Sequence, residues 1–302
     1  MKQFLKLFAI LFFIYLLLYN SYEVVETIKF SFDICVNNLF PSLIPFMLIT
    51  NILINYNFVE SLNLTPITNL LKINKNCSFI IIMSILSGTP SNSLYIKGLL
   101  ENNLISIDDA KKCLNFCHFT NPIFILTTIG YTFLNNKKLG LTILISHYLS
   151  SFIIGLFNKK EKKKNLIELK KDKYNKNFIQ ILKESINNTT SNLLLIMGII
   201  TTFSIIICLI NNIFNINNNY KFIYGLLEVT NGLKYVALSS FSIKIKTILS
   251  SIFISFGGLC IHAQVFCILE NKKIKYLPYF FSRLFHALLS ALLTFIILNI
   301  IL

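Results

Sequence analysis

The stretch "ILSSIFISFGGLCIHAQVFCIL" occupies residues 248–269 and decides the fold of this chain. It is long and apolar enough to cross a bilayer, because about 20 apolar residues in a helix span the hydrocarbon layer. Gly257 and Gly258 weaken that helix near its middle. His262 and Gln264 then bring hydrogen-bonding groups to the same depth. The stretch therefore predicts a membrane helix that is broken where polar side chains gather.

Similar apolar runs recur along the whole chain, which indicates a membrane protein. Of its 302 residues, 54% are hydrophobic and 14% are charged, which is more apolar surface than a soluble domain of this size can bury. We predict an all-α, polytopic helical membrane protein with roughly eight hydrophobic segments, and we place the number of spans at about six to nine. Segments with proline or paired glycines can instead be re-entrant hairpins. The runs lie near 4–19, 31–54, 77–100, 116–134, 139–157, 191–210, 247–269 and 284–302.

Basic residues predict the orientation of the chain in the membrane. The segment 158–176, "NKKEKKKNLIELKKDKYNK", holds nine Lys and three acidic residues within a chain of net charge +15. Such a loop is expected on the cytoplasmic face, with anionic lipid headgroups rather than nucleic acid as its partner. Lys2 and Lys6 place the N-terminus on the same face. Residues 1–20 are interpreted as a retained first span, because no small-x-small cleavage pattern follows; a secretory signal is the alternative.

The basic loop divides the chain into two halves that share a faint repeated plan. We predict an N-terminal span and connection at 1–30, a first membrane half at 31–157, the basic cytoplasmic loop at 158–177 and a second half at 178–302. Secondary transporters are often built from two such halves, whose broken helices meet around the substrate at the bilayer midplane. Chance similarity between apolar stretches is the alternative.

Two pairs of stretches carry the repeat. The first pair is "VNNLFPSLIPFM" at 36–47 and "INNTTSNLLLIM" at 186–197, which are 150 residues apart. The second pair is "SGTPSNSLYIKGLLEN" at 87–102 and "FGGLCIHAQVFCILEN" at 256–271, which are 169 residues apart and align Gly88 with Gly257. The second pair predicts one broken helix in each half.

The first predicted break is the polar run from Ser87 to Ser93, "SGTPSNS". Pro90 removes one amide, and hydroxyl and amide side chains surround it, which a lipid-facing helix would not contain. A helix that resumes after such a break presents its positive N-terminal end, which can hold an anion. For the second break, at Gly257, a close-packed helix crossing with satisfied polar side chains is the alternative to a binding site.

Two further polar groups lie within apolar surroundings. The first contains Asn115, His118, Thr120, Asn121 and Pro122, and it fits equally a ligand site or a helix that Asn121 caps and Pro122 begins.

The second group is Glu228, Thr230 and Asn231 in "YGLLEVTNGLKYV" at 224–236. An ionisable group at membrane depth costs about 2.5–3.5 kcal/mol on insertion scales, so Glu228 is expected to have a partner. Arg283, the only Arg of the chain, and a coupling cation are the candidates. An interfacial helix whose Glu228 reaches the lipid headgroups is the alternative.

The sequence predicts neither catalysis nor a resident cofactor or metal. It contains no nucleophile elbow, phosphate-binding glycine loop or paired-His motif. Cys113 and Cys117 are spaced four residues apart beside His118, as metal ligands can be, but no second ligand pair accompanies them and a packed helix face is sufficient to explain them. The seven Cys lie mostly in apolar runs, where a thiol behaves as a small hydrophobe.

Five stretches in the same order resemble the sporulation integral membrane proteins of the YlbJ (SpoVV) type, within the nucleoside-recognition or Gate-domain group. The resemblance runs from about residue 30 to residue 290 and is strongest around Glu228 and Gly257. Thr89 and Asn92 depart from the family pattern, which usually has an aromatic residue and a glycine there, and this puts the substrate in question. The stretches are "LFPSLIPFML", "SGTPSNS", "LNFCHFTNPIF", "GLLEVTNGLK" and "FGGLCIHAQV".

The resemblance implies a role in endospore formation, moving dipicolinic acid across a membrane that surrounds the forespore. Dipicolinate is a planar aromatic dianion, and His118, His262 and Arg283 with the half-helix N-termini would form an anion-receiving set. A nucleoside or another small solute is the alternative cargo, a non-transporting scaffold is the alternative role, and a homo-oligomer is left open. The predicted substrate-binding residues are Ser87, Gly88, Thr89, Pro90, Asn92, His118, Asn121, Glu228, Thr230, Asn231, Gly257, Gly258, His262, Gln264 and Arg283.

Overall fold

The computed structural model describes residues 2–56, 58–62, 64–159, 177–270 and 273–301, and the regular elements among them are all helical. This confirms the predicted all-α membrane fold. The elements of the first part are α1 (Lys2–Tyr19), α2 (Ser21–Ile34), η1 (Cys35–Leu39), α3 (Phe40–Asn55), η2 (Phe58–Ser61), α4 (Thr65–Leu70), α5 (Cys77–Ser87), α6 (Ser91–Glu101), α7 (Ile107–Phe116), η3 (Phe124–Phe133) and α8 (Lys137–Leu156). The second part contains α9 (Phe178–Phe214), η4 (Asn218–Leu226), α10 (Val229–Leu238), α11 (Ile243–Phe256), α12 (Gly258–Leu269) and α13 (Tyr276–Ile301).

Several of these helices have the length and composition of membrane spans, so the chain is a multi-pass integral membrane protein. Within the described ranges five stretches qualify, and three shorter apolar helices accompany them. The predicted run 4–19 lies in the first of these shorter helices. Unwound backbone interrupts the predicted runs 77–100 and 116–134, so each contains only a short apolar helix. The five stretches are Ser21–Asn55, Lys137–Leu156, Phe178–Phe214, Ile243–Leu269 and Tyr276–Ile301, and the shorter helices are Gln3–Tyr19, Cys77–Ser87 and Phe124–Phe133.

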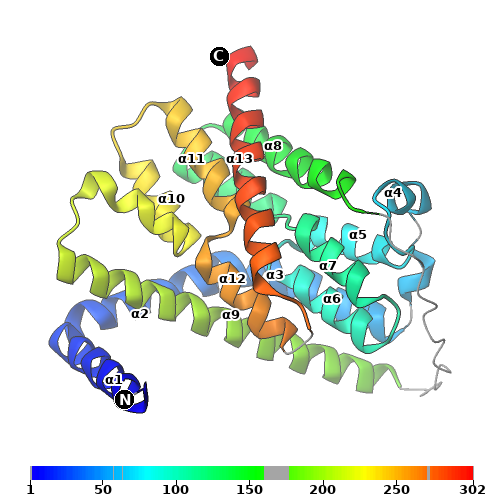
Figure 1. The fold of residues 1–302 in the computed structure, drawn as a ribbon, viewed down its shortest axis with the longest axis horizontal. Coiled ribbons are helices and arrows are strands. Elements are labelled where there is room, and N and C mark those ends of the chain that lie inside the picture. The colour runs from blue at the N-terminus through cyan, green and yellow to red at the C-terminus, as the bar shows by residue number, and fades with distance from the viewer. Residues whose placement is uncertain (1, 57, 63, 160–176, 271–272, 302) are drawn as a thin grey trace.

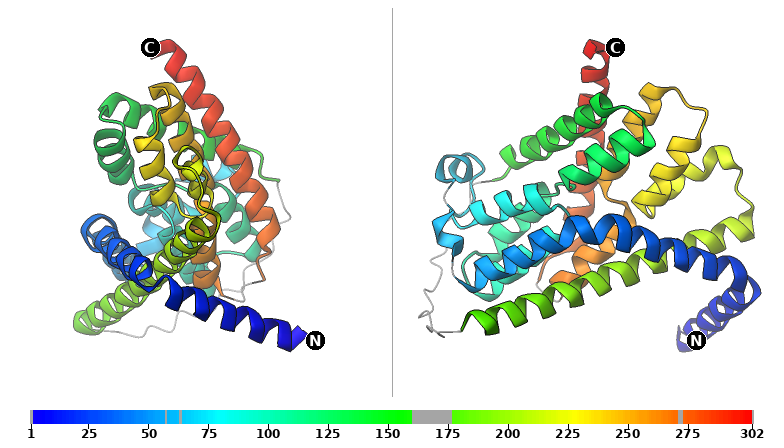
Figure 2. Two further views of the ribbon diagram at one scale, coloured as in Figure 1. Left: turned by 90° about the vertical axis from the view of Figure 1, so that its left-hand side faces the viewer. Right: turned by 180° about the vertical axis from the view of Figure 1, so that it is seen from behind.

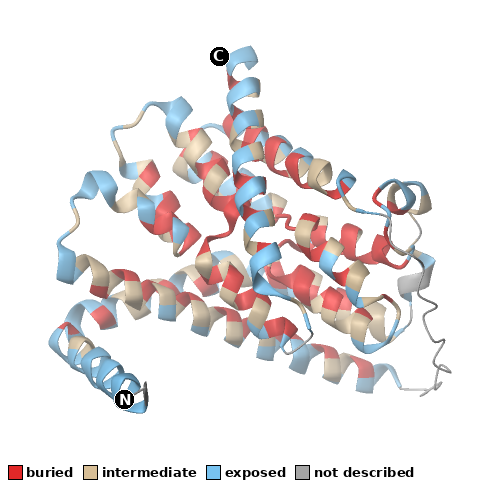
Figure 3. Ribbon diagram, viewed as in Figure 1, coloured by how far each residue is buried: buried red, intermediate tan, exposed pale blue. Residues whose placement is uncertain are grey.

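Burial follows the pattern of a protein that is surrounded by lipid. Apolar side chains such as Leu288 (62% exposed) face outward along α13, whereas Ser290 and Thr294 on the same helix are fully buried. Figure 3 shows this contrast along α13 and the mainly exposed surface of α1. Hydrocarbon can solvate leucine but not a hydroxyl group, so the polar side chains pair inside the bundle.

The helices form two groups with α12 between them (Figures 1 and 2). One group contains α5, α6 and α7, and its buried residues form a hydrophobic cluster that α12 and α13 extend. The other group contains η3, α8, α10 and α11, which share a second cluster. The long helix α9 runs along one side and packs against α2 and α3, while α13 packs against α8 and α11. The ends of the broken helices meet at the centre of this arrangement.

The two predicted breaks are present, but they differ in form. At the first, Gly88 (φ 81°) and the cis Thr89–Pro90 bond separate α5 from α6. The chain then reverses, so that the Tyr95 hydroxyl donates to Ser87 Oγ over 2.6 Å and α6 packs back along α5 as a hairpin. At the second, Gly257 (φ 88°) ends α11 and begins α12, which packs on α6 and α9.

Some predictions on organisation lie beyond what the structure describes. Residues 160–176 of the basic loop are outside the described residues, so its cytoplasmic location and its lipid contacts stay predictions. The division into halves at 31–157 and 178–302, the N-terminal unit at 1–30 and the possible homo-oligomer also stay predictions. The residues 1–20 form α1 from Lys2 onward and continue into α2 at Ser21.

Candidate substrate-binding site

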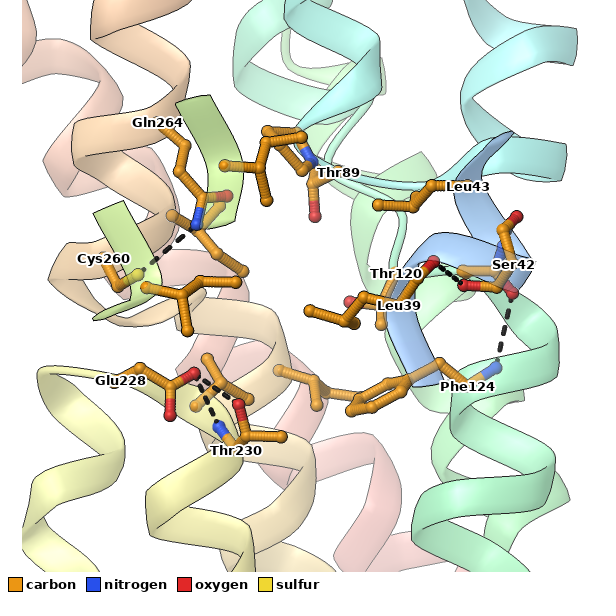
Figure 4. A pocket seen from close by; sticks show the side chains of 17 residues that line it. Leu39, Ser42, Leu43, Thr89, Thr120, Phe124, Glu228, Thr230, Cys260 and Gln264 are labelled. Carbon is orange, nitrogen blue, oxygen red and sulfur yellow. Dashed lines mark hydrogen bonds between the residues drawn. The ribbon is translucent and has the colours of Figure 1, made fainter. Parts of the chain in front are cut away.

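A pocket lies where the two breaks meet, and segments from both parts of the chain line it (Figure 4). Its polar lining comes from hydroxyl, amide and carboxyl side chains at several helix ends, and its apolar lining comes from η1, α3, η3 and α9 to α12. The described residues that line it include no Lys, Arg or His. They are Leu39, Ser42, Leu43, Thr89, Pro90, Thr120, Asn121, Phe124, Ile196, Ile200, Glu228, Val229, Thr230, Ile254, Cys260, Ile261 and Gln264.

The first break contributes Thr89 and Pro90 to the pocket wall. The backbone N–H of Thr89 donates to the Phe119 carbonyl over 2.8 Å, which ties the break to the segment that follows α7. A Cβ atom on Gly88 would lie 2.5 Å from the backbone nitrogen of Asn121, and its φ of 81° disfavours any other residue. Gly88 therefore serves close packing, while its neighbours Thr89 and Pro90 face the cavity.

An extended stretch from Cys117 to Asn121, here called the unwound segment, separates α7 from the next helix. Side chains from other elements satisfy much of its backbone, as a membrane interior requires. The Asn92 amide donates to the Cys117 carbonyl over 2.8 Å, and the Tyr148 hydroxyl lies 3.0 Å from the Thr120 carbonyl. Asn92, a predicted substrate ligand, thus holds the backbone and does not line the pocket.

Asn121 acts as the helix cap that was one of its two predicted functions, while ligand binding by Asn121 stays a prediction. Its Oδ1 accepts from the backbone N–H of Ile123 at 2.8 Å and of Phe124 at 3.3 Å, which is a helix cap. Its Nδ2 lies 3.4–3.5 Å from the carbonyls of Ser42, Leu86 and Ser87. The same side chain lines the pocket. Asn121 therefore connects the first break, η1–α3 and η3 at one point.

The second break brings α12 against the unwound segment. A Cβ on Gly257 would lie 2.9 Å from His118 Nε2, and one on Gly258 would lie 3.1 Å from the Leu227 carbonyl. Further along α12, Cys260 and Gln264 turn toward the pocket, with the Gln264 amide 3.4 Å from Cys260 Sγ. The glycines make a close crossing and the following turn lines the cavity, while a binding role for this break stays a prediction.

Glu228 lines the pocket and is 4% exposed, and Arg283, one of its two candidate partners, bonds elsewhere. Its carboxylate caps α10 by accepting from the backbone N–H groups of Thr230 (2.9 Å) and Asn231 (2.7 Å). The Thr230 hydroxyl (2.5 Å) and the Asn231 amide (2.8 Å) donate to it as well. The positive N-terminal end of a helix and four donors stabilise the buried carboxylate, so it needs no Arg.

Arg283 lies elsewhere, fully buried on α13. It donates to the carbonyl of Asn115 in the last turn of α7, to Ser282 Oγ (3.3 Å) and to His286 Nδ1 (3.0 Å). A cation beside the last carbonyls of a helix is favourable, because these carry the negative end of the helix dipole. Arg283 therefore stabilises the end of α7 and does not line the pocket.

The predicted anion-receiving histidines also lie outside the pocket lining. His262 Nε2 is 2.9 Å from the Phe256 carbonyl and its Nδ1 is 3.1 Å from the Tyr276 hydroxyl. His118 Nδ1 is 3.4 Å from the Tyr279 hydroxyl. These side chains, like Arg283, pack behind the unwound segment. Of the predicted residues, the pocket brings together Thr89, Pro90, Asn121, Glu228, Thr230 and Gln264.

The remaining predicted residues support the walls. Ser87 Oγ is bonded to Tyr95 and to the Met83 carbonyl, and the Asn231 amide reaches Ser204 Oγ over 3.2 Å. The prediction missed Ser42, whose position between two prolines in an apolar run was a readable signal. It also missed the apolar wall from α9, for which a uniformly apolar helix gives no signal.

Among the described residues, no three His, Cys, Asp or Glu side chains group as metal ligands, Cys113 and Cys117 included.

The chain is similar to a sporulation protein. It is 24% identical over 293 residues to the sporulation integral membrane protein YlbJ of Bacillus subtilis (strain 168), which covers 83% of this chain and 72% of that protein. No family model matches the chain. No solved structure matches it either.

Proposed function

We propose that this protein acts in sporulation as a carrier of a small organic anion, with dipicolinate as the candidate solute, across a membrane that surrounds the forespore. The similarity to the Bacillus subtilis protein supports the role in sporulation. The resemblance of the five stretches described above supports dipicolinate. Transport is supported by the pocket itself.

The observation that carries the proposal is the meeting of two broken membrane helices at one pocket. Thr89 and Pro90 come from the first break, and Cys260 and Gln264 come from the turn after the second. Interrupted helices leave polar backbone in the membrane interior, which is tolerated where protein or a cavity supplies partners. In secondary transporters such interruptions form the substrate site.

The pocket lining fits a planar solute that carries oxygen atoms. The hydroxyl groups of Thr89 and Thr120 and the amide groups of Asn121 and Gln264 can donate to carboxylate oxygens. The ring of Phe124 and the side chains of the apolar wall can pack against an aromatic ring.

The direct test is transport by the purified full chain in liposomes. Labelled dipicolinate is expected to enter these vesicles faster than protein-free vesicles. Thr89→Val removes one donor from the pocket with little change of shape and is expected to slow uptake about tenfold. Thr202→Val, at an exposed hydroxyl on α9, is the matched control and is expected to transport normally. Uptake no faster than in protein-free vesicles would contradict the proposal.

One observation favours a second cargo, a neutral solute such as a nucleoside. The pocket contains the carboxylate of Glu228 and no cationic side chain among its described lining, which suits hydroxyl groups better than a bare dianion. Unlabelled nucleosides in excess distinguish the two cargoes. Under our proposal they leave dipicolinate uptake unchanged, whereas uptake of labelled nucleoside in place of dipicolinate would establish the second cargo.

The physiological role has its own test, which also separates a carrier from a scaffold. A strain lacking the gene is expected to form spores with little dipicolinate, and the wild-type gene restores the content. A gene carrying Thr89→Val separates the two roles. A carrier with this change is expected to give spores with little dipicolinate, whereas a scaffold, which does not transport, would give spores with the normal content. Normal dipicolinate content in the deletion strain would contradict the role.

A further inference from the structure

All four histidines of the chain lie together behind the unwound segment, with the only Arg beside them. The rings of His147 and His286 stack at 4.7 Å between centroids, and the rings of His118 and His286 lie 6.1 Å apart. Tyr279 links His262 to His118, because its ring is 5.0 Å from that of His262 and its hydroxyl is 3.4 Å from His118 Nδ1. We call His118, His147, His262 and His286 the histidine cluster.

Hydrogen bonds hold two members of the cluster in the neutral form. His147 Nε2 accepts from the backbone N–H of Thr120 over 2.9 Å, so that nitrogen carries no proton and Nδ1 bonds to Ser255 Oγ. His286 Nδ1 accepts from Arg283 Nη1 over 3.0 Å. A second proton on either ring would remove a hydrogen bond, and on His286 it would also place two cations in contact. These two rings are therefore structural.

The other two members can accept a proton. His262 Nε2 bonds to the Phe256 carbonyl, and its Nδ1 faces the Tyr276 hydroxyl, which can donate or accept, so a protonated His262 keeps both bonds. His118 is fully buried, and its Nε2 is without a hydrogen-bond partner in the described structure. When Nδ1–H donates to the Tyr279 hydroxyl, Nε2 has a free lone pair that can accept a proton.

These side chains follow one another from the surface inward, joined by hydrogen bonds and, between His262 and Tyr279, by a ring contact. Tyr276 is 41% exposed, His262 is 2% exposed, and Tyr279 and His118 are buried behind them. The inner end of this series, His118, lies beside the second helix break, because a Cβ on Gly257 would lie 2.9 Å from His118 Nε2. Thr120 and Asn121 of the same unwound segment line the pocket.

The charges around the pocket explain why a proton would be needed there. The carboxylate of Glu228 is already in the pocket, so an entering anion adds negative charge in a medium of low dielectric constant. A proton on His118 would offset that charge. Without an anion, the positive charge of the nearby Arg283 disfavours the protonated form of His118. Each ligand therefore favours the other, and this coupling is reciprocal. The titratable or charged groups that face His118 are Tyr279, Arg283 and His286 on α13, His147 on α8, His262 on α12 and Cys117 on its own segment.

We propose that His118 and His262 form a proton-binding site, and that the protein takes up a proton there together with the anion in the pocket. The site makes the protein a proton-coupled carrier. This inference rests on the proposed transport of an anion.

Proton uptake on binding tests the inference directly. Dipicolinate is titrated calorimetrically into the purified full chain at about pH 6.5, the ordinary pKa of a free histidine, in two buffers of different ionisation enthalpy. The difference in heat gives the number of protons bound, which we expect to be about one per dipicolinate for the wild type. His118→Gln is expected to bind dipicolinate more weakly with almost no proton uptake.

His147→Gln is the matched control, because the glutamine oxygen can still accept from the Thr120 amide. It is expected to show wild-type proton uptake. Should His118→Gln fail to fold, His262→Gln carries the same expectation, with a folded state checked by gel filtration. Dipicolinate binding without proton uptake in the wild type, or undiminished uptake in His118→Gln or His262→Gln, would overturn the inference.

A transport measurement separates this inference from the proposed function. With an acid exterior, dipicolinate uptake into liposomes is expected to accelerate at least about threefold and to acidify the lumen. Uptake at a rate that does not depend on the pH gradient, with no change in the pH of the lumen, would overturn proton coupling alone. The complete absence of dipicolinate binding and uptake would overturn the proposed function, and this inference with it.

Discussion

At the scale of single residues, the site depends on groups that allow close approach and on groups that hold charge. Gly257 shows the first property, because its φ is 88° and a Cβ there would lie 2.9 Å from His118. Glu228 shows the second, because four donors surround its carboxylate in the wall of the pocket. Each property predicts the result of one substitution.

Gly257→Ala is expected to lower the free energy of unfolding by about 1–3 kcal/mol, because alanine at positive φ is strained and its methyl group contacts His118. Gly198→Ala is the control, since a Cβ at Gly198 on α9 meets nothing within 4 Å. That change is expected to be neutral or to stabilise by about 0.5–1 kcal/mol. Thermal unfolding in detergent measures both variants, and equal midpoints would contradict the argument.

Glu228→Gln is expected to raise dipicolinate affinity about tenfold, because it removes a negative charge from the pocket wall while it retains an acceptor at the start of α10. Glu23→Gln, at an exposed position on α2, is the control and should leave affinity unchanged. Equilibrium binding of labelled dipicolinate provides the measurement. Weaker binding by Glu228→Gln would show instead that the carboxylate itself contacts the solute or a bound cation.

At the scale of elements, the unwound segment is held by its neighbours and not by regular hydrogen bonding. Tyr148 illustrates this, because its hydroxyl lies 3.0 Å from both the Ile85 and the Thr120 carbonyls. It thereby joins α8 to the end of α5 and to the segment. Asn92 from α6 and Arg283 from α13 add further bonds to its backbone or to the carbonyl of Asn115 just before it.

Tyr148→Phe is expected to destabilise the protein by about 1–3 kcal/mol, because two carbonyls in the membrane interior share its one hydroxyl proton and lose it. Tyr131→Phe removes a hydroxyl at a position that is 61% exposed and is expected to change stability by less than about 0.5 kcal/mol. Chemical unfolding of both variants in mixed micelles gives the comparison. A loss of similar size at the two positions would indicate that Tyr148 contributes only packing.

The sequence predicted which helices are broken but not the form of each break. Gly88, Pro90 and Gly257 interrupt the helical pattern locally, so the positions of both breaks could be read directly. Whether the chain reverses or continues depends on contacts between segments, such as the bond between Tyr95 and Ser87. The sequence could not decide between the candidate partners of Glu228 for a similar reason. A carboxylate can be satisfied by its own helix end, and the acceptor for Arg283 is a carbonyl 168 residues away.

At the scale of the whole molecule, many hydroxyl side chains are buried within the bundle and many large apolar side chains are exposed on its surface. Ser251 Oγ lies 2.7 Å from Ser290 Oγ and 2.9 Å from Thr294 Oγ1, so hydroxyl groups join α11 to α13 within the bundle. Leu288 and other large apolar side chains face the surroundings. The periodic apolar pattern of the sequence predicted the helices and the membrane. It could not predict which face of each helix is turned inward, because both faces are largely apolar.

Ser290→Leu is expected to destabilise the protein by about 1–3 kcal/mol or more, because the site is fully buried and has no room for the larger side chain. Leu288→Ala removes an apolar side chain that is 62% exposed and is expected to have little effect in lipid. Unfolding of both variants in lipid nanodiscs tests this. Comparable destabilisation by Leu288→Ala would mean that another protein surface covers that face of α13.

The bonds to the unwound segment have a mechanical consequence. They clamp the α5–α6 hairpin, α7, α8 and α13 into a single block, since moving any one of them alone would strand a carbonyl in hydrocarbon. The opposite side, formed by η1, α3, α9 and α10, is tied to the segment by the weak 3.5 Å contact between Asn121 and the Ser42 carbonyl. Movement between the clamped block and this opposite side would therefore break fewer hydrogen bonds of the unwound segment than movement within the block.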